Sequence, residues 1–138
     1  MKKILALFIL IFPLLVFAQG FDESFDKVKT ISWINSKNIK PAGNTYNLSS
    51  LKTNVTYTEN FFDKNSTASW KLNLADVKIS TSGKNLVLTC TKDGCIEYSF
   101  SSPTGTETKK INSLELEATN SVNDLYKAMT TLVKRVGL

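Results

Sequence analysis

The chain of 138 residues contains no histidine, which removes most of the side-chain arrangements that catalyse reactions at neutral pH. A Ser-His-Asp triad and a Cys-His pair both need a histidine to accept the proton of the nucleophile. Zinc sites use histidine or several cysteines, and the two cysteines of this chain cannot form such a site alone. The composition therefore predicts a protein that is not an enzyme and that has no metal or cofactor.

Cys90 and Cys95 are the two residues that could form a covalent cross-link. The export signal described below places them in an oxidising compartment, where a disulfide is favoured. Strand geometry favours two separate thiols, because a hairpin with the three-residue loop Lys92-Asp93-Gly94 turns Cys95 toward Thr91 and away from Cys90. The spacing is not the C-x-x-C of redox sites. The sequence leaves a structural disulfide and two separate thiols as the alternatives.

Glu115 and Glu117 lie two residues apart and can be compared with paired catalytic carboxylates. Both would project from the same face of one strand, so they cannot flank a cleft as the carboxylates of glycosidases do. We interpret them as part of a solvent-exposed strand face.

Trp33 and Phe62 are the candidates for contact with a partner, because exposed aromatic residues often dominate binding energy. For Trp33 the alternative is a place in the core. Phe62 is preferred to Phe61, which we expect in the core, because neighbouring residues of a strand point to opposite faces.

The first eighteen residues have the layout of a secretory signal peptide. Lys2 and Lys3 precede an apolar run of 15 residues from Ile4 to Ala18, and Ala18 offers a small residue for cleavage before Gln19. The run is shorter than the roughly 20 residues of a membrane-spanning helix. We therefore expect a protein exported to the periplasm or the extracellular space, with no membrane span after cleavage.

Removal of residues 1–18 leaves one domain and changes its charge. Without Lys2 and Lys3 the chain has 15 basic and 12 acidic residues, a net charge of +3. These charges are scattered, whereas nucleic-acid binding needs a clustered basic surface. We expect an N-terminal helical segment and linker over residues 19–44 and a β-rich domain over residues 45–138, with no nucleic-acid partner.

The N-terminal segment has the periodicity of a helix. Phe21, Phe25, Val28 and Ile31 recur at spacings of three and four, which predicts a helix from Phe21 to Lys37 with this stripe buried. The helix must end before the break at Pro41-Ala42-Gly43-Asn44.

Residues 46–118 alternate apolar and polar side chains, which predicts β-strands. The alternation slips by one residue at Ala75-Asp76, and we expect a bulge or sharp bend there. A hairpin is predicted between residues 86–91 and 95–101, with Leu86 opposite Phe100. Ile111, Leu114 and Leu116 are assigned to a single last strand.

A C-terminal helix over residues 121–135 is the most regular pattern in the chain. Ser121 and Asp124 resemble a capping box, and apolar residues then repeat at spacings of three and four. The members of this stripe are Val122, Leu125, Ala128, Met129, Leu132, Val133 and Val136.

The segment Thr30–Lys37 resembles the T-I-x-W-I-N-x-K opening of small exported proteins of Bacteroidota type. The strand ending at Cys90, the return at Cys95-Ile96 and the helix residues 125–133 are also similar to that group. Strands closed by one C-terminal helix resemble a pleckstrin-homology-like domain. The resemblance implies a mainly β, α+β fold, namely a bent antiparallel sheet or partial barrel of about six or seven strands.

Domains of this kind generally bind or scaffold other molecules, and no catalytic residue is carried over. We therefore expect a non-enzymatic module that binds an unidentified protein or peptide. The alternative is a carrier that holds a small apolar, lipid-like ligand inside the barrel. The C-terminal helix discriminates between them, because little room remains if Leu125, Met129 and Leu132 fill the barrel mouth.

Overall fold

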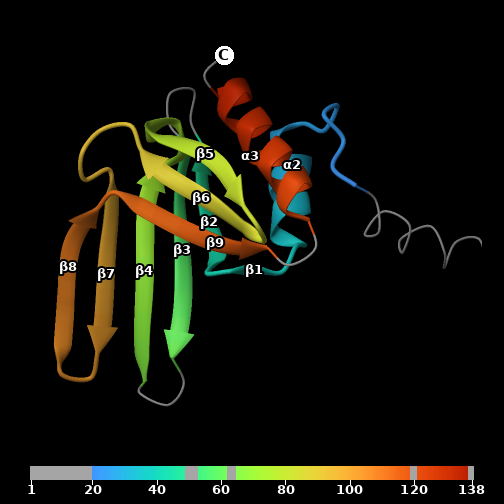
Figure 1. Ribbon diagram of the computed structural model, residues 1–138. Coiled ribbons are helices and arrows are strands. Elements are labelled where there is room, and N and C mark those ends of the chain that lie inside the picture. Colours follow the sequence, from blue (N-terminus) through green and yellow to red (C-terminus); the bar gives the residue numbers. More distant parts are fainter. Residues whose placement is uncertain (1–19, 49–52, 62–64, 119–120, 137–138) are drawn as a thin grey trace, which may run out of the picture.

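The computed structural model describes residues 20–48, 53–61, 65–118 and 121–136, which form two antiparallel sheets with helices packed beside them (Figure 1). The four-stranded sheet has the order β1-β9-β6-β5, with strands at Ile39–Lys40 (β1), Val77–Ser82 (β5), Asn85–Cys90 (β6) and Ser113–Ala118 (β9). The five-stranded sheet has the order β2-β3-β4-β7-β8, with strands at Ala42–Leu48 (β2), Thr53–Phe61 (β3), Ser66–Asn73 (β4), Ile96–Ser102 (β7) and Gly105–Ile111 (β8). The mainly β fold with helices is confirmed. The described residues form nine strands in two sheets instead of six or seven in one bent sheet, and no closed barrel is present among them.

The C-terminal helix α3 spans Val122–Val136 and confirms the predicted helix to within one residue at each end. It begins where the backbone N–H of Leu125 donates to the carbonyl oxygen of Ser121, at 2.8 Å. α3 packs on β5 and β6 and contacts the N-terminal helix on its other side. Its apolar stripe is buried as predicted at Leu125, Ala128, Met129 and Leu132.

The four-stranded sheet presents one apolar face to α3. β6 and β9 alternate apolar and polar residues, and their register places Leu86 opposite Leu116 and Leu88 opposite Leu114. All four leucines are buried, and they join α3 and part of the five-stranded sheet in one core. The apolar residues that repeat every two positions in the strands therefore pack against those that repeat about every 3.6 positions in the helix.

The chain crosses from the five-stranded to the four-stranded sheet at the predicted bend. A short 3₁₀ helix, η2 (Leu74–Asp76), joins β4 to β5 and buries Leu74. The Asn73 side-chain oxygen accepts hydrogen bonds from the Ala75 N–H and, at 2.9 Å, from the Thr53 hydroxyl. The one-residue slip in the alternation therefore marks a change of sheet, which is a larger event than a bulge.

Two other strand predictions are wrong for the same reason. β6 pairs with β5 and β9, whereas β7 pairs with β4 and β8, so the predicted hairpin with Leu86 opposite Phe100 does not form. The single last strand divides at Asn112, because Ile111 ends β8 in one sheet and Leu114 belongs to β9 in the other. The chain instead changes sheets in both segments, between β6 and β7 and between β8 and β9.

The N-terminal helix α2 spans Lys27–Asn35 and is shorter than predicted. Asp26 caps it by accepting a hydrogen bond from the Lys29 N–H at 2.8 Å, which fixes the start of the helix. The predicted stripe is wrong at Val28, which is 73% exposed, whereas its other members are half-buried against the core. The fully buried residues of the helix are Thr30, Trp33 and Ile34. Residues 39–44, assigned to a linker, form β1 and the start of β2.

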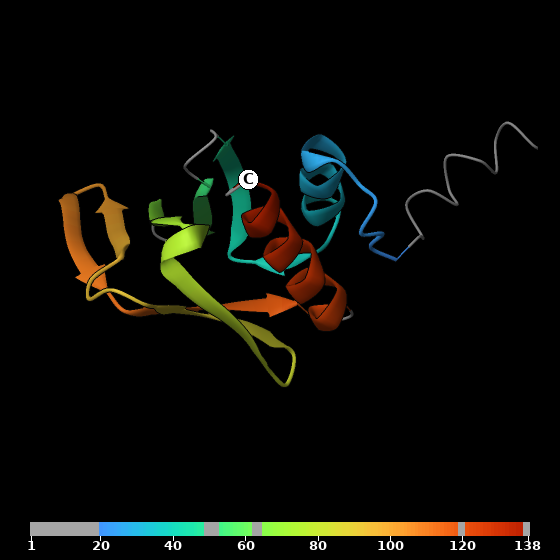
Figure 2. The ribbon, with the colours of Figure 1, turned by 90° about the horizontal axis from the view of Figure 1, so that it is seen from above.

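Figure 2 shows the arrangement that matters for the rest of the molecule. Both helices lie at one end, beside β1 and β2, and the β7–β8 hairpin lies at the opposite end. The far part of the five-stranded sheet therefore extends beyond the helices that cover the core.

Candidate functional site

One face of the five-stranded sheet carries a continuous series of apolar side chains. The strand register places Val55 opposite Leu72, and it aligns Tyr57, Trp70 and Tyr98 in the next row. Val55, Leu72 and Tyr57 are buried under the rest of the fold, whereas Trp70 and Tyr98 are only half-buried. The cover over the large side chains of this face therefore ends within a single row, although the small Ala68 farther along β4 is buried.

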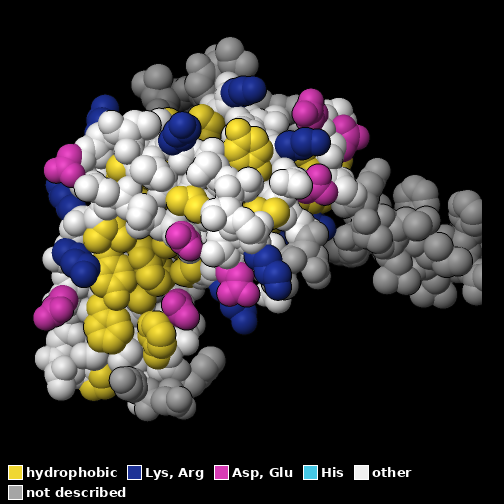
Figure 3. Space-filling view, viewed as in Figure 1, with side chains coloured by type: hydrophobic (Ala, Val, Ile, Leu, Met, Phe, Trp, Pro, Cys, Tyr) yellow, Lys and Arg dark blue, Asp and Glu magenta, His cyan; other side chains and the backbone are white. Residues whose placement is uncertain are grey.

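Beyond that limit lies the aromatic patch, which we define as Phe61, Trp70, Tyr98 and Phe100. The ring centroids of Trp70 and Tyr98 are 5.3 Å apart, and those of Phe61 and Phe100 are 6.3 Å apart. Both distances are typical of favourable aromatic pairs. Figure 3 shows apolar side chains gathered on this face, over the region of β4 and β7 in Figure 1.

Charged side chains frame the aromatic patch. Glu59 and Glu107 stand in the same cross-strand row as Phe100, one at each side. Lys109 lies over the Tyr98 ring, with its Nζ atom 5.4 Å from the ring centroid. A shallow groove of about 570 Å³ at this edge is lined by Tyr98, Phe100, Glu107, Thr108 and Lys109. An apolar centre with a charged rim is the usual composition of a protein-binding surface.

The opposite face of the same strands is polar. The hydroxyl groups of Ser99 and Thr108 lie 3.1 Å apart across β7 and β8, and those of Ser101 and Thr106 lie 3.1 Å apart in the next pair. These cross-strand contacts hold the hairpin in register without any apolar layer behind it. The aromatic patch is therefore specific to one side of the sheet.

At the covered end of the aromatic row, two tyrosine hydroxyl groups are buried together. The hydroxyl groups of Tyr46 and Tyr57 lack a hydrogen-bond partner of good geometry among the described residues. Burial raises the pKa of Tyr46 to about 12, and the neighbouring Tyr57 hydroxyl opposes part of this rise. Burial, with the nearby Tyr46, also raises the pKa of Tyr57 well above its usual value.

A disulfide joins Cys90 to Cys95 and confirms the first of the two alternatives for these residues. Their Cα atoms are 5.6 Å apart, across the segment that connects β6 to β7. The strand argument for separate thiols assumed that these two strands pair, and this constraint disappears because they belong to different sheets. The chain-entropy model assigns such a short loop about 2 kcal/mol of stabilisation.

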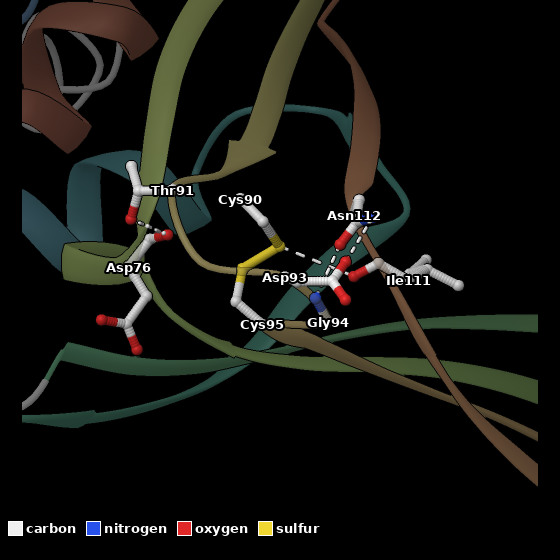
Figure 4. The surroundings of a disulfide bond; sticks show 8 residues. All are labelled: Asp76, Cys90, Thr91, Asp93, Gly94, Cys95, Ile111 and Asn112. Carbon is white, nitrogen blue, oxygen red and sulfur yellow. Dashed lines mark hydrogen bonds between the residues drawn. A yellow bond between two sulfur atoms is a disulfide. The ribbon is translucent and has the colours of Figure 1, made fainter.

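The disulfide lies at the junction where the chain changes sheets (Figure 4). The Asn112 carbonyl oxygen accepts from the Cys90 N–H at 2.8 Å, and its side chain accepts from the Gly94 N–H at 2.6 Å. Thr91 donates both its N–H and its hydroxyl to the carbonyl oxygen of Asp76. All three crossings after β4 are therefore tied together, and this junction fixes how the two sheets are oriented.

The site residues proposed from the sequence do not lie together in the structure. Trp33 is 7% exposed and packs in the core, beside the Phe21 ring at 5.4 Å between centroids. It is therefore a core residue and not a surface contact. Phe62 lies outside the described residues. Glu115 and Glu117 are exposed on the outer face of β9, where Glu115 accepts a hydrogen bond from Asn85.

Sequence reasoning missed most of the aromatic patch. Phe61 was expected in the core, but it is 39% exposed at the end of β3. Tyr98 and Phe100 lie in the second strand of the predicted hairpin, residues 95–101, and this hairpin does not form. Their shared parity with Trp70 was visible in the sequence, but it showed only that they share a face, not that the face lacks cover.

Two features are absent from the described part of the chain. No three of its His, Cys, Asp and Glu side chains gather as ligands for a metal ion. Among the residues that are placed, no helix has the length and apolar character needed to cross a membrane. No protein-family model, curated protein or solved structure matches this chain.

Proposed function

We propose that this protein is an exported, non-enzymatic binding module that holds a protein or peptide partner on its aromatic patch. The observation that carries the proposal is the loss of cover within one row of the five-stranded sheet, from buried Tyr57 to half-buried Trp70 and Tyr98. Contiguous exposed apolar surface on a water-soluble domain is unfavourable unless a partner covers it, and it commonly marks an interaction site.

The charges around the patch indicate the chemistry of the partner. Glu59 and Glu107 flank Phe100 on the same face, so two carboxylates border the place where an apolar side chain would dock. A partner segment with an apolar or aromatic anchor next to Lys or Arg would match this surface. The anchor supplies buried area, and the cations supply orientation and a faster approach.

The absence of histidine supports a non-enzymatic role, since the common proton-transfer and nucleophile arrangements need it. The export assignment rests on residues 1–18, and the disulfide between Cys90 and Cys95 is in keeping with an oxidising compartment.

An internal carrier site has less support than the surface site. Leu125, Met129 and Leu132 are fully buried between α3 and the sheets, so the helix fills the space that a ligand would need. A small cavity beside Tyr46, under the end of α2, has a volume of about 40 Å³. That space suits a few water molecules but not a lipid chain.

A random peptide display library tests the proposal directly. We expect selected peptides to share an apolar or aromatic residue flanked by Lys or Arg. The double variant Tyr98→Ser, Phe100→Ser should weaken their binding about 30-fold or more, because loss of central aromatic anchors costs about 2 kcal/mol or more.

The matched control is Ser99→Ala, which lies between these two residues on the polar face and should leave the affinity unchanged. Selection of no peptide above background, or full binding by the double variant, would contradict the proposal.

A further inference from the structure

The outer edge of β8 is the feature of this molecule that the proposed function leaves unexplained. β8 is the last strand of the five-stranded sheet, and residues 105–110 are all exposed. An uncovered edge of this kind is a template for pairing with another strand. Figures 1 and 2 place this edge at the end of the molecule opposite α2, where neither helix obstructs an approaching strand.

The backbone groups available at this edge follow from the hairpin register. Ser102 lies opposite Gly105 across a two-residue loop, and Glu107 and Lys109 then lie opposite Phe100 and Tyr98. In an antiparallel pair the hydrogen-bonded positions alternate. The N–H and C=O groups of the intervening residues therefore point outward, and these residues are Thr106, Thr108 and Lys110.

We propose that two copies of this chain pair antiparallel through β8, with the two-fold axis at Thr108. This register pairs the whole strand, from Gly105 opposite Ile111 of the second copy to Ile111 opposite its Gly105. It also places Glu107 opposite Lys109 of the second copy, and Lys109 opposite the second Glu107. The strand is therefore complementary in charge to itself when reversed.

The neighbouring registers are unfavourable for the same electrostatic reason. A two-fold axis at residue 107 places two Glu107 carboxylates together, and an axis at residue 109 places two Lys109 ammonium groups together. Directly opposed like charges destabilise a strand pair, whereas opposite charges stabilise it. Lysine on an edge strand usually discourages pairing. Here Glu107, two residues away on the same face, gives each Lys109 a matching partner in one register only.

Such a dimer would bring two aromatic patches together. Antiparallel pairing keeps the same face of both copies on one side, so the two grooves lined by Tyr98, Phe100, Glu107 and Lys109 would meet at the two-fold axis. One strand edge per copy is a small interface, and we expect a weak dimer with a dissociation constant of about 10 µM to 1 mM.

Charge reversal provides the test, read by sedimentation velocity of the protein purified after export, over about 10 µM to 1 mM. Glu107→Lys and Lys109→Glu should each weaken self-association about ten-fold or more, because either change creates like-charge pairs on both sides of the axis. An equimolar mixture of the two single variants should form a mixed dimer, because two lysines on one β8 strand then face two glutamates on the other. The double variant Glu107→Lys, Lys109→Glu should also recover self-association.

Two further variants separate this edge from the rest of the surface. Thr108→Pro removes an outward N–H at an edge position where proline is tolerated, so it should abolish pairing while the thermal unfolding temperature stays close to that of the original protein. Lys78→Glu makes the same charge change as Lys109→Glu at an exposed position of β5 and should leave the dimer intact.

A protein that stays monomeric over this whole range would overturn the proposal. Single variants that associate as well as the original, or a double variant and a mixture that stay monomeric although the original protein associates, would also overturn it. These outcomes are distinguishable from failure of the proposed function, because they are read from self-association alone, whereas peptide binding is tested separately with Tyr98→Ser, Phe100→Ser.

Discussion

The two sheets present apolar faces built by the same alternation, yet the large side chains of these faces differ in how well they are covered. In the four-stranded sheet, Leu86, Leu88 and Leu116 have no exposed surface, because α3 packs directly over β5 and β6. In the five-stranded sheet the corresponding series begins with fully buried Tyr57 and ends at Phe61, which is 39% exposed. The alternation is therefore common to both faces, and the cover is what distinguishes them.

This difference teaches how the fold separates stability from binding. A face covered by a helix contributes its transfer free energy to folding, whereas an uncovered apolar face leaves that free energy for association with a partner. On the opposite face of the sheet, hydroxyl pairs hold β7 to β8, the strands beside the aromatic patch. The disulfide fixes the segment that leads into β7. A surface held in this way needs little rearrangement to bind, which keeps the cost of binding low.

The largest effect should come from a charge placed in the covered face. Leu132 is fully buried on α3, and Leu132→Asp should lower the free energy of unfolding by about 4 kcal/mol, because an unpaired carboxylate enters the core and leaves a cavity. Urea unfolding of the purified variant measures this change. Lys127→Asp, on the exposed side of the same helix, is the control and should cost about 0.5 kcal/mol or less. Equal losses for both variants would mean that α3 does not cover the sheet.

The covered end of the aromatic row should respond to high pH. An unfolded tyrosine ionises near its ordinary pKa of 10.0, but burial raises the pKa of Tyr46 to about 12 and that of Tyr57 well above its ordinary value. Between pH 10 and about 12 the unfolded chain therefore binds fewer protons than the folded one. The stability contributed by these groups is full below pH 10 and falls above it, by about 1.4 kcal/mol per pH unit for each affected tyrosine.

Tyr57→Phe should reduce this slope, as measured by urea unfolding at a series of pH values from 9 to about 11.5. Val55→Ala, on the same face of β3, is the control because it weakens the core without removing a titrating group. It should lower stability at every pH and leave the slope unchanged. If Tyr57→Phe retained the full slope, the covered end of the row would be open to solvent.

The elements that sequence patterns predicted are those whose signal is local. The period of α3 fixed its buried residues, and the slip in alternation at Ala75-Asp76 located a change of sheet. A similar one-residue slip separates Ile111 from Leu114 and coincides with the change of sheet at Asn112. The alternation of apolar and polar residues continues without a slip from β6 through Cys90 and Cys95 into β7. It therefore could not show that these two strands belong to different sheets.

The choice between two helical faces and the extent of cover are not local properties. In α2 the spacing of Thr30, Trp33 and Ile34 is as helical as the stripe that includes Val28, and only packing against the rest of the molecule decided between them. The aromatic patch was missed for a related reason. Residue parity assigns Phe61 and Tyr98 to a face, but the cover of that face depends on where α2 and α3 end.

The smallest effect should come from the exposed end of the aromatic patch, at Phe61. Phe61→Ser should lower the free energy of unfolding by about 1 kcal/mol or less, because a partly exposed ring contributes only part of the roughly 1.5–3 kcal/mol of a fully buried one. Leu86→Ala, in the covered face, is the matched comparison and should cost about 2–5 kcal/mol. Phe61→Ser should also reduce the fluorescence of an apolar dye added to the folded protein, whereas Leu86→Ala should not reduce it. If Phe61→Ser cost as much as Leu86→Ala and left the dye signal unchanged, the two faces would be equally covered, and the case for binding at the aromatic patch would fail.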